Sequence, residues 1–125
     1  MSFTEIKHSL RLEPLNDLKA NPEYVRVVDA YNHAGKNILA FLDRNPYFGS
    51  EFMEKFIAEC KSFVVLIREG KDDESILKEK DAYELVAGEG IIHQEFVDFN
   101  TLFGNFKNAT HAFLSLENGL LDEQK

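Results

Sequence analysis

A run of phenylalanines in the C-terminal third of the chain constrains the fold more than any other feature. The rings recur at alternating spacings of three and four residues, and Thr110 occupies the one skipped step. At about 100° per residue they fall on one stripe of a long helix. The stripe contains Phe96, Phe99, Phe103, Phe106 and Phe113, and Ile92 and Leu114 extend it at its two ends. The pattern predicts the central element of an all-α domain.

This helix is not expected to be stable alone and must pack against other helices. Burying a phenylalanine gains about 1.5–3 kcal/mol, whereas ordering each residue of the backbone costs roughly 1–2 kcal/mol. Two earlier segments carry apolar stripes that can face it. The stripe of the first is Tyr24, Val28, Tyr31, Ile38 and Leu42, with Gly35 on the same face, and that of the second is Phe52, Phe56, Cys60, Phe63 and Ile67. We expect both segments to be helices that pack against the phenylalanines.

Capping residues and glycines set the expected boundaries of these two helices. Asn21 followed by Pro22 predicts a helix start, and the helix is expected to run to about Arg44, before Asn45-Pro46. Ser50 is a candidate cap for the next helix, and Gly70 is expected to end it. The apolar run 63–67 also has the composition of a buried strand. We favour a helix there because the stripe continues unbroken from Phe52.

The remaining segments are shorter. Ser2 and Glu5 have the spacing of a capping box, which predicts a short first helix that Pro14 ends, with one more turn at residues 15–18. Residues 71–75 are expected to form a charged turn before a short helix over 76–87. Asn118-Gly119 is a candidate helix terminus, so we expect residues 117–125 to form a frayed tail. The sequence therefore predicts one all-α domain over residues 1–125, a compact up-and-down bundle of four to five helices.

Charge and cysteine content restrict the classes of partner and compartment. The 22 acidic residues outnumber the 14 Lys and Arg, which gives a formal net charge of −8. That charge disfavours nucleic acid and is compatible with a basic protein partner. A single cysteine, no secretory segment and no apolar run near the ~20 residues of a membrane span predict a cytoplasmic chain that does not cross a membrane.

Metal and cysteine chemistry have weak candidates. His93 and His111 lie on one side of the long helix but about 27 Å apart at 1.5 Å per residue, too far to share a metal. Glu5 and His8 have the spacing of half a di-metal site, but no second such pair exists. Cys60 lies on an apolar stripe, where its thiol is expected to be buried and inert. We predict no metal site and no cofactor; a small-ligand site between the phenylalanine rings, with His93 or His111 at its edge, is an alternative.

One spacing matches a catalytic pair. Arg26 and His33, separated by six residues, lie on the second predicted helix and away from its apolar stripe. The pair resembles the arginine–histidine pair of HEPN-type ribonucleases, which are small helical proteins. The resemblance covers these two residues and implies a ribonuclease that uses Arg26 and His33.

The side of the long helix opposite the phenylalanines is polar but almost uncharged. It carries Gln94, Asp98, Thr101, Asn105 and Asn108. Exposed helix surfaces in so charged a chain usually carry Lys and Glu, so amides and hydroxyls here indicate an interface held by hydrogen bonds. We therefore expect a small acidic protein that binds another protein, as an inhibitor, immunity factor or regulatory adaptor does, and that can form a homo-oligomer through this face.

Overall fold

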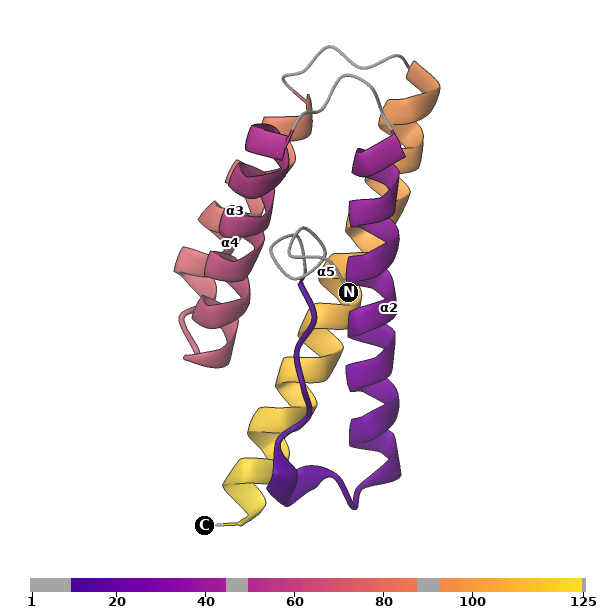
Figure 1. The fold of residues 1–125 in the computed structure, drawn as a ribbon. Helices are drawn as coiled ribbons and strands as arrows, with labels where there is room; N and C mark the ends of the chain where they lie inside the picture. The colour runs from indigo at the N-terminus through magenta and orange to yellow at the C-terminus, as the bar shows by residue number, and fades with distance from the viewer. Residues whose placement is uncertain (1–9, 45–49, 88–92, 125) are drawn as a thin grey trace.

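A computed structural model describes residues 10–44, 50–87 and 93–124, and every regular element in these ranges is helical. The elements are a 3-10 turn η1 (Asn16–Leu18) and the helices α2 (Pro22–Arg44), α3 (Ser50–Arg68), α4 (Asp72–Ala87) and α5 (His93–Glu123). Helix α2 packs along α5, and α3 packs along α4, so two helix pairs form the bundle (Figure 1). The predicted all-α bundle with a long C-terminal phenylalanine-striped helix is confirmed.

Helix α2 begins where its capping sequence predicts. The Oδ1 atom of Asn21 accepts the backbone N–H of Tyr24 at 3.0 Å, and Pro22 occupies the first helical position. This is the N-cap to N3 bond that satisfies one free amide of a helix start. The helix ends at Arg44, as expected; the Asn45-Pro46 stop itself lies outside the described residues.

The end of α3 is fixed by a glycine. Gly70 has φ +78°, and its N–H and that of Lys71 donate to the carbonyls of Ile67 and Leu66 at 3.0 and 2.8 Å. These bonds form a Schellman motif, which needs a left-handed residue that glycine adopts without steric strain. The preceding run 63–67 is helical, so the choice of helix over strand is confirmed. The predicted Ser50 cap concerns a side chain outside the described set.

The described phenylalanines of α5 lie at the centre of the bundle. Phe99, Phe103, Phe106 and Phe113 are all buried. Rings from each of the other three helices contact them: Tyr31 of α2 lies 5.5 Å from Phe106, Phe63 of α3 lies 5.8 Å from the same ring, and Tyr83 of α4 lies 5.8 Å from Phe99. Tilted and edge-on ring pairs of this kind add to the gain from burial. The side chain of Phe96 and residue Ile92 lie outside the described set.

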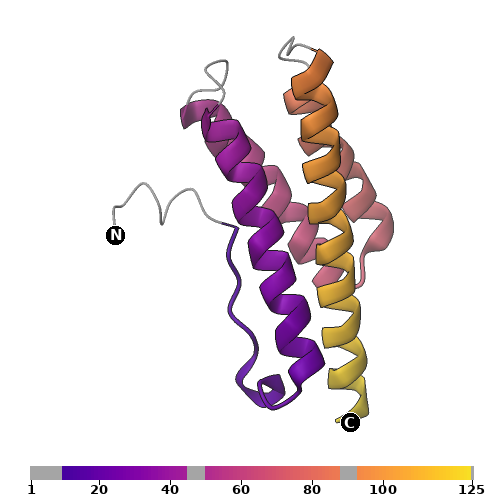
Figure 2. The same cartoon turned by 90° about the vertical axis from the view of Figure 1, so that its right-hand side faces the viewer.

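An extended segment over residues 10–15 runs beside α2 (Figure 2). Its backbone is bound by side chains of that helix: Asn32 Oδ1 accepts the N–H of Leu12 at 2.8 Å, Asn32 Nδ2 donates to the Leu12 carbonyl at 2.9 Å, and the Tyr31 hydroxyl donates to the Leu10 carbonyl at 2.7 Å. A Cβ atom at Gly35 would meet the Cβ of Leu10 at 3.3 Å, so the glycine of the α2 stripe admits this segment. The predicted first helix falls on residues 1–9, outside the described residues, and the expected turn at 15–18 is present as η1.

Two predicted boundaries are wrong. Helix α4 begins at Asp72, so residues 72–75 are its first turn and not a loop. Asp73 and Glu74 in this turn lie near the positive end of the helix dipole, which favours acidic residues, so their charge did not interrupt the helix. Helix α5 does not end at Asn118-Gly119 but continues to Glu123, because Leu120 and Leu121 still pack against the core. The segment from residue 117 to 123 is therefore helical and not a frayed tail.

Candidate functional site

The predicted polar face of α5 is open to solvent. The side chains of Gln94, Asp98, Thr101, Asn105 and Asn108 are all exposed. The bonds that they make are local: Gln94 Nε2 donates to Asp98 Oδ1 at 3.2 Å, and Thr101 Oγ1 donates to the Val97 carbonyl at 3.2 Å. The five residues therefore lie on one side of α5, as expected from their spacing.

This face extends beyond the five predicted residues. Val97 is 41% exposed beside Gln94 and Thr101. Further along the same side of the helix, Ala112, Ser115 and Gly119 are also exposed. Asp98 is the one formal charge among these residues. The strip is therefore poor in charge compared with the chain as a whole, in which 29% of the residues are charged.

The predicted ribonuclease pair lies on the exposed side of α2. Arg26 and His33 are both exposed, and Arg26 Nη2 lies 3.6 Å from Glu23 Oε1, one turn earlier on the same helix. A weak surface ion pair of this kind leaves the guanidinium accessible. The structure thus keeps both side chains available without bringing them into contact with each other.

The cysteine and histidine candidates lie in different surroundings. Cys60 is fully buried, and burial, reinforced by the nearby Glu59 carboxylate, raises the pKa of its thiol far above the usual range. A neutral buried thiol is a poor nucleophile. His111 Nε2 lies 3.8 Å from Glu79 Oε2 on α4. No cluster of His, Cys, Asp and Glu of metal-binding size occurs within the described ranges; Glu5, His8 and the His93 side chain lie outside them.

A buried polar network was not predicted from the sequence. Glu117 of α5 is only 1% exposed. Its carboxylate accepts the Tyr24 hydroxyl at 2.8 Å, and it accepts Arg68 Nε at 2.9 Å and Nη2 at 3.1 Å. The Tyr24 oxygen in turn accepts the N–H of Leu15 at 3.0 Å. Burial is the main reason that the pKa of Tyr24 is raised, and the Glu117 carboxylate adds to it. The network ties α2, α3, α5 and the extended segment together.

One sequence signal could have identified this network. Glu117 follows Phe113 by four residues, so it continues the phenylalanine stripe and must point into the core if the helix continues. A buried carboxylate there requires a cationic or hydrogen-bonding partner. The partner, Arg68, lies 49 residues earlier in the chain, and no local pattern connects the two positions.

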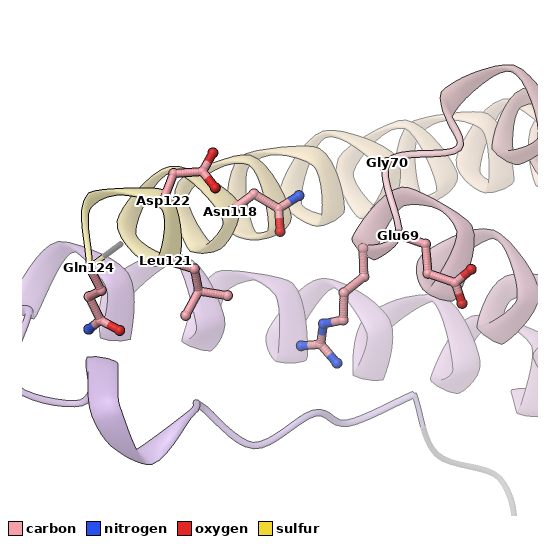
Figure 3. A pocket seen from close by; sticks show the side chains of 7 residues that line it. Glu69, Gly70, Asn118, Leu121, Asp122 and Gln124 are labelled. Atoms are coloured by element: carbon pink, nitrogen blue, oxygen red, sulfur yellow. The ribbon is translucent and has the colours of Figure 1, made fainter.

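A cavity opens beside this network, where the end of α3 meets the end of α5 (Figure 3). It has a volume of about 710 Å³. Glu69, Asp122, Asn118 and Arg68 contribute polar groups to its wall, and Glu117 already neutralises the arginine. The wall therefore combines carboxylates, amides and a neutralised cation, which gives no single charge for a small ligand to match.

No helix within the described residues is both long and apolar enough to cross a membrane. Comparison of the chain with protein families, with curated proteins and with solved structures gives no match.

Proposed function

We propose that this chain acts in the cytoplasm by binding another protein, as an inhibitor, immunity factor or regulatory adaptor does. The interface is the exposed face of α5 that carries Gln94, Asp98, Thr101, Asn105 and Asn108. A basic protein is one candidate partner, because the chain has a net charge of −8. A second copy of the chain is the other candidate.

The observation that supports this proposal is that the polar and almost uncharged strip on α5 is exposed along its whole length. Amide and hydroxyl groups on a solvated surface gain little over water, but against a complementary surface they fix orientation through paired hydrogen bonds. Exposed small residues on the same side, such as Ala112 and Gly119, also let a second backbone approach closely. The strip therefore offers a partner helix hydrogen-bond donors and acceptors, together with small side chains that allow close packing.

The test introduces charge into the strip. Thr101→Glu combined with Asn105→Glu places two like charges one turn apart on the exposed side of α5. The control, Ala30→Glu combined with Asn37→Glu, adds the same charge to exposed positions of α2. Sedimentation over a range of concentrations measures self-association, and affinity capture from the source cell over a salt series measures partner binding.

We expect the α5 variant to weaken self-association or partner capture, and we expect the α2 variant to behave as the unmodified chain. A partner that is lost steeply with salt would indicate the acidic surface, and one retained in salt would indicate the almost uncharged strip on α5. Equal sedimentation and equal capture for all three proteins would count against the proposal.

A ribonuclease that uses Arg26 and His33 is the second candidate function, and the exposure of both side chains is the observation that favours it. An RNA cleavage assay separates the two functions. Cleavage that is lost on His33→Ala, in a protein with an unchanged circular dichroism spectrum, would favour the enzyme. Absence of cleavage by the unmodified chain would exclude it.

A further inference from the structure

Residues 10–18, which we call the strap, are held against α2 mainly through their backbone. Asn32 donates to the Leu12 carbonyl at 2.9 Å and accepts the Leu12 N–H at 2.8 Å. The Tyr31 hydroxyl donates to the Leu10 carbonyl at 2.7 Å. Because these bonds engage backbone atoms, the same two side chains can hold any extended segment that lies in this register.

Leu10 gives the strap its specific apolar contact. Its side chain is only 4% exposed, and its Cβ atom lies 3.3 Å from the position that a Cβ on Gly35 would take. The Phe106 ring lies 3.5 Å from the same position. A leucine of the strap therefore reaches the phenylalanine core through the space that the glycine leaves. We call Tyr31, Asn32 and Gly35 the α2 clamp.

The strap also completes the buried network of Glu117. The Leu15 N–H donates to the Tyr24 oxygen at 3.0 Å, and the Tyr24 hydroxyl donates to Glu117 at 2.8 Å. Leu18, at the end of η1, is 5% exposed. Removing the strap would expose two buried leucines and leave polar groups without their partners, so the folded bundle favours an occupied clamp.

A hinge of three residues, Lys19, Ala20 and Asn21, joins the strap to α2. The chain reverses direction there, so that the strap runs back along its own helix (Figure 2). Lys19 has φ −61° and ψ −21°, and its N–H lies 3.4 Å from the Asn16 carbonyl oxygen. Lys19 and Ala20 are exposed. An extended hinge would carry the strap away from its own clamp and leave its contact groups available to another molecule.

From these contacts we infer that two copies of this chain associate by exchanging straps, each strap filling the α2 clamp of the other copy. The bonds to the strap are the same in the exchanged dimer as in the single chain, so the exchange changes only the hinge and the cost of association. The clamp already holds an extended, leucine-bearing segment, and a second copy supplies that same segment. The clamp is separate from the strip on α5, so this inference does not depend on the proposed interface.

Effective concentration determines when the exchanged dimer forms. A strap on a short hinge competes for its own clamp at a concentration of roughly millimolar order, so the unmodified chain should exchange only near ~1 mM. A hinge that disfavours the closed turn should lower this threshold. Ala20→Pro does so, because a residue that precedes proline is disfavoured in the helical region, which is the conformation of Lys19.

The first experiment measures association by sedimentation over about 10 μM to 1 mM of full chain. Ala20→Pro should form dimers at a concentration about tenfold lower than the unmodified chain. The matched control, Ala20→Gly, loosens the same hinge without extending it and should not lower the threshold. Circular dichroism checks that each variant keeps its helices.

A disulfide then identifies the chain that supplies the strap. The Cβ separation of 3.3 Å is within a few tenths of an ångström of that in disulfides, so Leu10→Cys combined with Gly35→Cys should crosslink on oxidation. The bond stays within one chain when the strap is in its own clamp, and it joins two chains after exchange. We expect covalent dimers on a non-reducing gel with Ala20→Pro. With the unmodified hinge, their share should rise with the protein concentration during oxidation. Each single cysteine variant controls for crosslinks that do not need the pair.

Either of two results would overturn the inference. One is a disulfide that stays within single chains at every concentration, which tests the unmodified hinge even if Ala20→Pro fails to fold. The other is a folded Ala20→Pro variant that associates no more readily than the unmodified chain. Thr101→Glu combined with Asn105→Glu separates this inference from the proposed function. Interchain disulfides that persist with these changes support exchange, whereas a dimer with intrachain disulfides that dissociates keeps the α5 interface and excludes exchange.

Discussion

The buried Glu117 carboxylate gives the sharpest prediction about stability. Glu117→Gln keeps the shape of the side chain and one oxygen to accept the Tyr24 hydroxyl, but it removes the charge that faces Arg68. The hydrogen bond from Arg68 Nε at 2.9 Å is then replaced by opposed N–H groups. The bond from Arg68 Nη2 at 3.1 Å, which shares the oxygen that accepts the Tyr24 hydroxyl, loses its charge assistance. Hydrogen bonds to charged groups contribute about 1.5–3 kcal/mol each.

The expected loss is smaller than the sum of the two bonds. The Arg68 side chain is 37% exposed, so its guanidinium recovers part of the lost interaction by hydration. Its position 5.8 Å from the Phe113 ring is retained, and the cation still packs there. We therefore expect Glu117→Gln to lower the free energy of unfolding by about 2–3 kcal/mol, below the 3–5 kcal/mol of a fully buried pair that loses one partner.

Urea unfolding followed by circular dichroism measures this change, with the m-value showing that both proteins unfold in the same way. Arg68→Met and the double variant complete a mutant cycle. We expect the double variant to be more stable than the sum of the two single effects by at least about 1 kcal/mol, because the two groups interact directly. As a control, Glu51→Gln removes the partner of Lys55 from an exposed pair and should change stability by less than about 0.5 kcal/mol.

Additive single effects, or a Glu117→Gln variant as stable as the unmodified chain, would refute this reasoning. Either result would mean that the carboxylate and the guanidinium are solvated separately and do not hold α5 against α3.

Three further predictions follow from the same packing. Gly119→Ala should raise the free energy of unfolding by about 0.5–1 kcal/mol, because the residue lies inside α5 with nothing within 4 Å of the added Cβ. Urea titrations measure this change, and a loss of stability would mean that the helix ends there. Cys60 should react with a thiol reagent only through global unfolding, so its rate should rise with urea in step with the unfolded fraction; fast labelling in native buffer would contradict its burial. Burial raises the pKa of Tyr31 well above the usual range of a tyrosine, so its contribution to stability should be full below pH ~10 and should fall as the pH rises further. Tyr31→Phe should reduce that slope in alkaline unfolding curves; an identical slope would exclude this tyrosine as the cause.

Local signals predicted most of the helix boundaries. Asn21-Pro22 and Gly70 act through bonds within a few residues, so their effect can be read without knowing the neighbours. The same local reasoning placed the start of α4 too late. It also ended α5 too early, because leucines after Gly119 pack on distant helices and override the weak terminus signal.

The candidate sites also differ in whether a local pattern could predict them. The polar face of α5 was predictable because the period of one helix determines which residues share a side. The buried network of Glu117 was not, since it needs Arg68 of α3 beside Glu117 of α5.

By itself, the sequence determined that this chain is a helical bundle with the phenylalanines of α5 at its centre, because hydrophobic period and capping chemistry act over a few residues. Only the tertiary structure decided which apolar side chains remain in water, and that Glu117 meets Arg68 and Tyr24 inside the core. Those outcomes depend on helix pairing, which joins residues far apart in the chain by packing and not by any local pattern.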